Sequence, residues 1–154
     1  MSRENLEGLL RGLAASAGFP DLGLDADGRC LVRIDGRIDL AIEFEDDSQS
    51  LMLTARCGAL PQSNRERVLQ ALLDANFYGA GSGGATLSTN SREGMVYLQF
   101  REPTLHLDQA RLQDLLQAAI VNAEFWGARL VKLAAEPAAH APAHAHAHHA
   151  YTRA

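Results

Sequence analysis

Positive charge is scarce in this sequence. Lysine occurs once, at Lys132, and 14 basic residues face 19 acidic ones, for a net charge of −5. Because binding to nucleic acid relies on clustered lysine and arginine, this composition argues against a nucleic-acid partner. Long apolar runs are also missing, since none approaches the roughly 18 residues of a membrane span, and the polar start is not that of a secretory signal. We expect a cytoplasmic protein that does not bind membranes.

Cysteine and histidine, which serve many catalytic and metal sites, are sparse before residue 134. Cys30 and Cys57 are the only cysteines, and without an export signal we interpret both as small buried apolar residues. His106 is the one histidine of this part and lies between two leucines, which is typical of a structural role. A Cys–His or Ser–His pair stays open on sequence distance alone, but few bases accompany each nucleophile. We predict no catalytic residue and no enzymatic activity.

The sequence does contain enough apolar residues for one compact core. Of its 154 residues, 47% are hydrophobic, which suits one domain and not two. Beyond Ala134 the composition changes to alanine, proline and alternating histidine, with five of the six histidines. Such a run is more often a low-complexity extension with incidental metal affinity than a set of ligands. We predict a domain over residues 1–133, a disordered tail over 134–154, no metal site and no cofactor.

The apolar spacing predicts, in order, a helix, three strands, a helix, two strands and a helix. The first helix ends before Gly18, and one of its faces is lined by Leu6, Leu9, Leu10, Leu13 and Ala17. Alternating apolar residues over 30–34 and 38–44 flank Asp35-Gly36, a strong hairpin signal, and a third strand follows over 51–57. We therefore expect the first three strands to form an antiparallel meander.

The second predicted helix, over residues 64–77, is apolar around about two-thirds of its circumference. One sheet cannot cover that much surface, so the helix is buried either deep in its own domain or between its own sheet and another molecule. A small domain offers little depth, which favours self-association. The third helix, over 108–133, has one clean apolar stripe, with Val121 and Phe125 nearly opposite it. That pair is either ordinary surface or part of a contact surface.

A glycine-rich run, residues 76–87, joins the second helix to the fourth strand. It reads Asn-Phe-Tyr-Gly-Ala-Gly-Ser-Gly-Gly-Ala-Thr-Leu. A phosphate-binding loop would follow a strand and end in Gly-Lys-Ser/Thr, and neither condition is met here. By composition alone, the run is typical of a helix C-cap followed by a flexible connector.

This run, with the strand over 95–101 behind it, resembles the Tir-chaperone (CesT-like) family of type III secretion chaperones. In that family the second helix ends in Asn-Leu/Phe-x-Gly-x-Gly-(Ser/Thr)-Gly-Gly-x-Thr-Leu. The resemblance spans about residues 3–133 and includes Leu22-Gly23-Leu24-Asp25, Asp35-Gly36, Ala59-Leu60-Pro61, Leu72-Leu73 and Ala123-Glu124-Phe125-Trp126. The His-rich tail and the high glycine content of residues 79–84 depart from the family pattern.

The resemblance implies an α+β fold with a twisted antiparallel sheet and three helices. It also implies a homodimeric, ATP-independent chaperone that holds the N-terminal region of a secreted effector in extended form and delivers it to the secretion ATPase. An extended client can add a strand to a sheet edge and insert alternate side chains into apolar pockets. The expected partners are therefore the effector, a second copy of the chain and the ATPase.

Candidate contact residues follow from this expectation. For the effector they lie on the first helix and on neighbouring sheet positions: Leu6, Leu10, Leu13, Leu31, Met52 and Leu98. For the dimer they lie on the second helix and the fourth strand: Val68, Leu72, Ala75 and Leu87. The alternative for each position is a plain core role. Two other functions stay open, namely a regulatory module of the same fold acting on a transcriptional activator or anti-activator, and a small enzyme.

Overall fold

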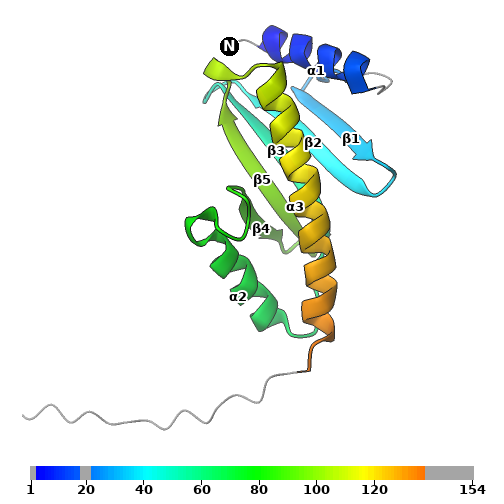
Figure 1. The fold of residues 1–154 in the computed structure, drawn as a ribbon, viewed down its shortest axis with the longest axis vertical. Helices are drawn as coiled ribbons and strands as arrows, with labels where there is room; N and C mark the ends of the chain where they lie inside the picture. The colour runs from blue at the N-terminus through cyan, green and yellow to red at the C-terminus, as the bar shows by residue number, and fades with distance from the viewer. Residues whose placement is uncertain (1–2, 18–21, 138–154) are drawn as a thin grey trace, which may run out of the picture.

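The computed structural model describes residues 3–17 and 22–137 of the chain. Its elements are α1 (Arg3–Ala17), β1 (Arg29–Ile34), β2 (Ile38–Glu45), β3 (Ser50–Ala59), α2 (Arg65–Asn76), η1 (Phe77–Gly79), β4 (Thr86–Asn90), β5 (Met95–Pro103), η2 (Thr104–His106) and α3 (Gln109–Ala135) (Figure 1). The predicted α+β class and element order are confirmed. Most of the predicted tail, residues 138–154, lies outside the described part.

The five strands form one antiparallel sheet in the order β1-β2-β3-β5-β4. Asp35 and Gly36 turn β1 into β2 with φ angles of 48° and 66°, and the strands start to pair at Ile34 and Ile38. A left-handed conformation costs little at glycine and is tolerated by aspartate, which explains why this dipeptide marks the hairpin. The two edges of the sheet are therefore β1 and β4.

One face of the sheet carries the core. Helix α3 lies across that face and packs on β2, β3 and β5 (Figure 1). The predicted stripe of α3 is buried, with Trp126 among the largest fully buried side chains, and β2 buries every second residue. The alternate residues point to the other face of the sheet, as the two-residue period of a strand requires.

The helices begin and end for local reasons. Asp108 caps α3, because its side chain accepts a hydrogen bond from the backbone N–H of Arg111 at 2.8 Å. At the other end of α3, the side chain of Asn64 donates to the carbonyl oxygens of Leu133 and Glu136 at 3.1 and 2.6 Å. The start of α2 is thereby joined to the end of α3. Within the described residues, no helix is long and apolar enough to cross a membrane.

Candidate functional site

The glycine-rich run is a packed joint between α2, β4 and α3. The side-chain oxygen of Asn76 accepts from the backbone N–H of Leu87 at 2.8 Å, and its amide donates to the carbonyl of Leu87 at 3.0 Å. Asn76 thus makes the pair of bonds that a neighbouring strand would make on the outer edge of β4. The composition alone predicted a flexible connector here, but these two hydrogen bonds join the first and last residues of the run.

Two glycines of the joint have physical reasons, space at Gly81 and a left-handed backbone with a φ of 65° at Gly83. A Cβ atom on Gly81 would lie 2.8 Å from the Cβ of Ala75, and one on Gly83 would lie 2.7 Å from the side-chain nitrogen of Asn122. The indole N–H of Trp126 donates to the carbonyl of Gly81 at 3.1 Å. The small residues therefore let the loop pass between α2 and α3 in close contact with both.

We expect Asn76→Asp to destabilise the fold by about 2 kcal/mol. The carboxylate keeps the acceptor for the N–H of Leu87 but faces its carbonyl without a donor, and it adds a negative charge at the C-terminal end of α2. Urea unfolding followed by circular dichroism measures the loss. Asn5→Asp makes the same chemical change at an exposed position of α1, and its effect should stay within about 0.5 kcal/mol. Equal stability of the two variants would show that the hydrogen bonds between Asn76 and Leu87 do not stabilise the fold.

An exposed apolar surface covers the outer side of α2 and η1. Leu73, Phe77 and Tyr78 are 65%, 71% and 92% exposed, and the rings of Phe77 and Tyr78 meet edge to face with centroids 4.6 Å apart. Tyr78 also has a φ of 54°, which is uncommon for a bulky residue and often marks a functional site. We call these three residues, with the half-buried Leu69, the α2 surface.

The four residues predicted for a dimer interface lie beneath that surface. Val68, Leu72, Ala75 and Leu87 are between 0% and 7% exposed and belong to the core of the single chain. The two apolar sides of α2 therefore have different positions, one inside the domain and one facing outward. Sequence periodicity found both sides but could not tell which of them the sheet covers.

The face of the sheet opposite α3, which we call the open face, is built from three parallel rows of side chains. The middle row is uncharged and crosses all five strands through Leu31, Ala41, Thr54, Gln99 and Thr86. One flanking row consists of Arg33, Asp39, Arg56, Tyr97 and Ser88, and the other of Arg29, Glu43, Met52 and Arg101. An uncharged track thus runs between two largely charged ones.

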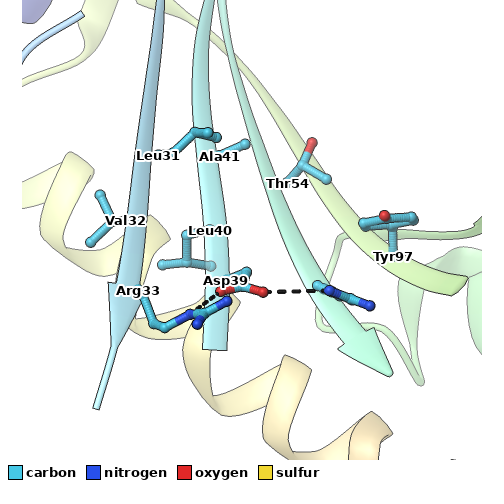
Figure 2. A pocket seen from close by; sticks show the side chains of 9 residues that line it. Leu31, Val32, Arg33, Asp39, Leu40, Ala41, Thr54 and Tyr97 are labelled. Carbon is cyan, nitrogen blue, oxygen red and sulfur yellow. Dashed lines mark hydrogen bonds and ion pairs between the residues drawn. The ribbon is translucent and has the colours of Figure 1, made fainter. Parts of the chain in front are cut away.

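A hollow of about 490 Å³ opens on this face over β1, β2 and β3 (Figure 2). Its floor has small side chains at Ala41 and Thr54, and Leu31, which is 78% exposed, stands at its side. Asp39 accepts from Arg33 at 2.5 Å and lies 3.6 Å from Arg56. The hydrogen bond with Arg33 is the main reason why the pKa of Asp39 lies below its usual value. Asp39 is therefore ionised at neutral pH.

A second, smaller cavity of about 230 Å³ lies on the helix-covered side of β1 and β2. Leu13 from α1, Val32 from β1 and Ile120 from α3 line it, together with Leu22, Ile34, Leu40, Ile42, Gln113, Leu116 and Gln117. We call it the α1 groove. Because β1 is an edge strand, an extended chain placed beside it would have the α1 groove on one side and the open face on the other.

The six residues predicted to contact an effector separate into two groups. Leu31 is exposed, Met52 is partly exposed on the open face, and Leu13 lines the α1 groove at 6% exposure. The other three, Leu6, Leu10 and Leu98, are 0% exposed and hold α1 and β5 in the core. Strand alternation places Leu31 and Met52 on the face opposite their apolar neighbours, but the sequence could not tell which face of the sheet the helices cover.

The cysteines are part of the core. Cys30 and Cys57 are buried and are not joined to each other. Burial raises the pKa of the Cys57 thiol to about 12, so this thiol is protonated at neutral pH and is a poor nucleophile. Within residues 3–17 and 22–137, no group of three or more His, Cys, Asp or Glu side chains could hold a metal ion.

Comparison with known families decides the identity of this fold. The model of the Tir chaperone protein (CesT) family matches residues 8–127. The chain belongs to that family. The resemblance inferred from the glycine-rich joint is therefore confirmed over most of the domain. A comparison with curated proteins found no significant match.

Several solved structures share the fold at low sequence identity. The ExsC–ExsE complex matches with a TM-score of 0.75 and 20% identity, covering 83% of this chain and 95% of that chain. The HopA1–SchA chaperone–effector complex gives 0.69 and 19%, covering 83% and 98%. The Yersinia pestis type III secretion chaperone SycH, in complex with a stable fragment of YscM2, gives 0.62 and 18%, covering 78% and 98%. The family is a chaperone family, and the fold is the one found in these chaperone complexes.

Proposed function

We propose that this member of the CesT family binds the N-terminal region of a secreted effector as a homodimer and keeps it soluble and competent for export. It would act in the cytoplasm and target the effector to the export apparatus and its ATPase, without nucleic acid or membrane as a partner. Family membership supports the chaperone role. The complexes formed by HopA1 with SchA and by SycH with YscM2 show that this fold accommodates protein partners.

The observation that carries the proposal is the position of the α1 groove beside an edge strand. β1 is paired only with β2, so its outer backbone groups can bond to an added strand of the effector. In an added strand, alternate side chains would point into the α1 groove and onto the open face next to Leu31. Main-chain bonds would then supply affinity, and the two apolar sites would supply selectivity.

The homodimer is supported by the α2 surface. Leu73, Phe77 and Tyr78 form an apolar patch on one short helix and its end, and contiguous patches of this kind often mark protein interfaces. Two copies related by a two-fold axis would bury the same patch on both sides. The predicted residues Val68, Leu72, Ala75 and Leu87 would then support the interface from beneath.

The proposal is tested by co-expressing the chain with candidate effectors encoded near its gene, followed by capture, mass spectrometry and light scattering. The capture tag should not depend on the native histidines. We expect a complex of two copies with one N-terminal effector segment. A monomer that captures nothing would overturn the proposal, and specific capture of a transcriptional regulator would favour the regulatory alternative.

Leu31→Asp is expected to reduce the affinity for the captured effector by about tenfold, because it places a charge on an apolar contact. Leu31 is 78% exposed, so the free energy of unfolding should change by less than about 0.5 kcal/mol. Leu105→Asp is the matched control, since Leu105 is 73% exposed and lines neither the hollow nor the α1 groove. Similar binding by both variants, measured by calorimetry, would exclude the open face as a contact.

A further inference from the structure

The hollow on the open face has an unequal number of positive and negative groups. Its lining contains two guanidinium groups, Arg33 and Arg56, and a single carboxylate, Asp39. Glu93 lies outside this lining and accepts a hydrogen bond from the hydroxyl of Tyr97 at the rim. One positive charge of the hollow is therefore not matched within its lining.

The two arginines are held to very different degrees. The Nε of Arg33 lies 2.5 Å from one oxygen of Asp39, whereas Nη1 of Arg56 lies 3.6 Å from the other (Figure 2). Arg56 also donates from Nη2 to the sulfur of Met95 at 3.3 Å, and sulfur is a weak acceptor. A carboxylate that approached Arg56 could form a two-pronged contact stronger than either of these.

The small, uncharged floor of the hollow and the neighbouring Leu31 are close enough to act together with Arg56. Ala41 and Thr54 belong to the middle row, and Arg56 is two residues beyond Thr54 on the same strand, a separation of about 7 Å. An apolar and an acidic side chain this far apart occur two residues apart in a strand, or three to four apart in a helix. A single short segment can therefore fill the floor and reach Arg56.

The net charge of the whole chain makes this contact selective. At −5, the chain repels acidic segments in general, so an acidic side chain is favoured only where a local cation is left without a strong partner. Arg101, on the opposite flanking row, differs because Glu45 already accepts from it at 2.9 Å. Of the two, Arg56 has the weaker existing partner and therefore more to gain from an added carboxylate.

We propose that Arg56 determines client specificity by binding an acidic side chain of the client whose apolar neighbour fills the hollow. This inference rests on the proposed function, because it names the chemistry of the segment that the chaperone holds. The partner is a protein segment with Asp or Glu next to an aliphatic residue. Removing the guanidinium removes the preference for the acid and leaves the apolar contact in place.

The test is selection from a random 15-residue peptide library displayed on phage, with the full-length wild-type chain and Arg56→Gln as targets. We expect Asp or Glu beside aliphatic residues among the wild-type peptides, and loss of this preference with Arg56→Gln. For one synthetic wild-type peptide, Arg56→Gln should raise the Kd about tenfold, and Arg101→Gln should change it less than twofold. Arg56→Glu should instead select peptides with Lys or Arg.

The possible outcomes distinguish a failure of this inference from a failure of the proposed chaperone function. Selection of no peptide by the wild-type chain would overturn both. Selected peptides without an acidic preference, or with one that survives Arg56→Gln, would overturn the inference alone. Loss of binding with Arg101→Gln as well would assign the effect to the general charge of the face. Binding of a labelled single-stranded DNA that Arg56→Gln abolishes would assign the arginine to phosphate instead. Circular dichroism verifies that each variant is folded.

Discussion

A chain with both Leu73→Asp and Phe77→Asp is expected to be monomeric at concentrations at which the wild type is dimeric. Both side chains are mostly exposed in the single chain, so the charges stay in water in the monomer but become desolvated in the dimer. Loss of two apolar contacts at the centre of an interface costs about 4 kcal/mol or more, which weakens dimerisation on the order of a thousandfold. Sedimentation velocity over a concentration series measures the change.

The control for this prediction is a charge placed on a different exposed residue. Val131 lies on α3 and is 71% exposed, and Val131→Asp should leave the dimer intact. The fold of the double variant should also survive, because Val68 and Leu72 remain in the core. A wild type that is monomeric at all concentrations, or a double variant that stays dimeric, would contradict the α2 surface as the interface.

Trp126→Ala is expected to cost about 3–5 kcal/mol of unfolding free energy, the largest stability loss from any single truncation considered for this chain. Trp126 lies on the buried face of α3, is 1% exposed, and donates a hydrogen bond to the carbonyl of Gly81. Its removal leaves a large cavity and an unpaired acceptor in the joint. Since domains of this size are stable by about 5–15 kcal/mol, the variant should unfold at much lower urea concentration.

Trp126→Phe separates the two contributions of the indole. Phenylalanine fills most of the volume but cannot donate to Gly81, so the expected loss is only about 1–2 kcal/mol. If both variants have the wild-type slope of the urea transition, neither changes the surface exposed on unfolding. If both variants lost the same free energy, the hydrogen bond and not the packing would dominate this site.

Most of the fold could be predicted because its signals are local. The period of two in β2 and the Asp35-Gly36 turn specify a hairpin, and the apolar stripe of α3 specifies one buried face. The glycine-rich run was informative for a different reason. Its residues are required by close contacts among α2, β4 and α3, which only a family pattern could reveal in advance.

The contact surfaces were harder to predict, because they depend on which apolar residues the fold leaves uncovered. Leu31 and Leu98 are the same residue type and both occupy strands, yet one is 78% and the other 0% exposed. Their difference arises from the side of the sheet that α3 covers. The imbalance between Arg33, Arg56 and Asp39 also arises only after three strands align. Sequence spacing contains no information on that register until the hairpins are known.

Asn76 has a consequence for how many chains can join this sheet. A sheet with two bare edges can be extended from both ends, and repeated extension is the route to fibres. Here the side chain of Asn76 bonds to the outer edge of β4 at Leu87, whereas β1 has no second strand beside it among the described residues. Each protomer can thus accept a strand from one end only. A chaperone of the proposed function could in this way bind one unfolded client without becoming the seed of an aggregate.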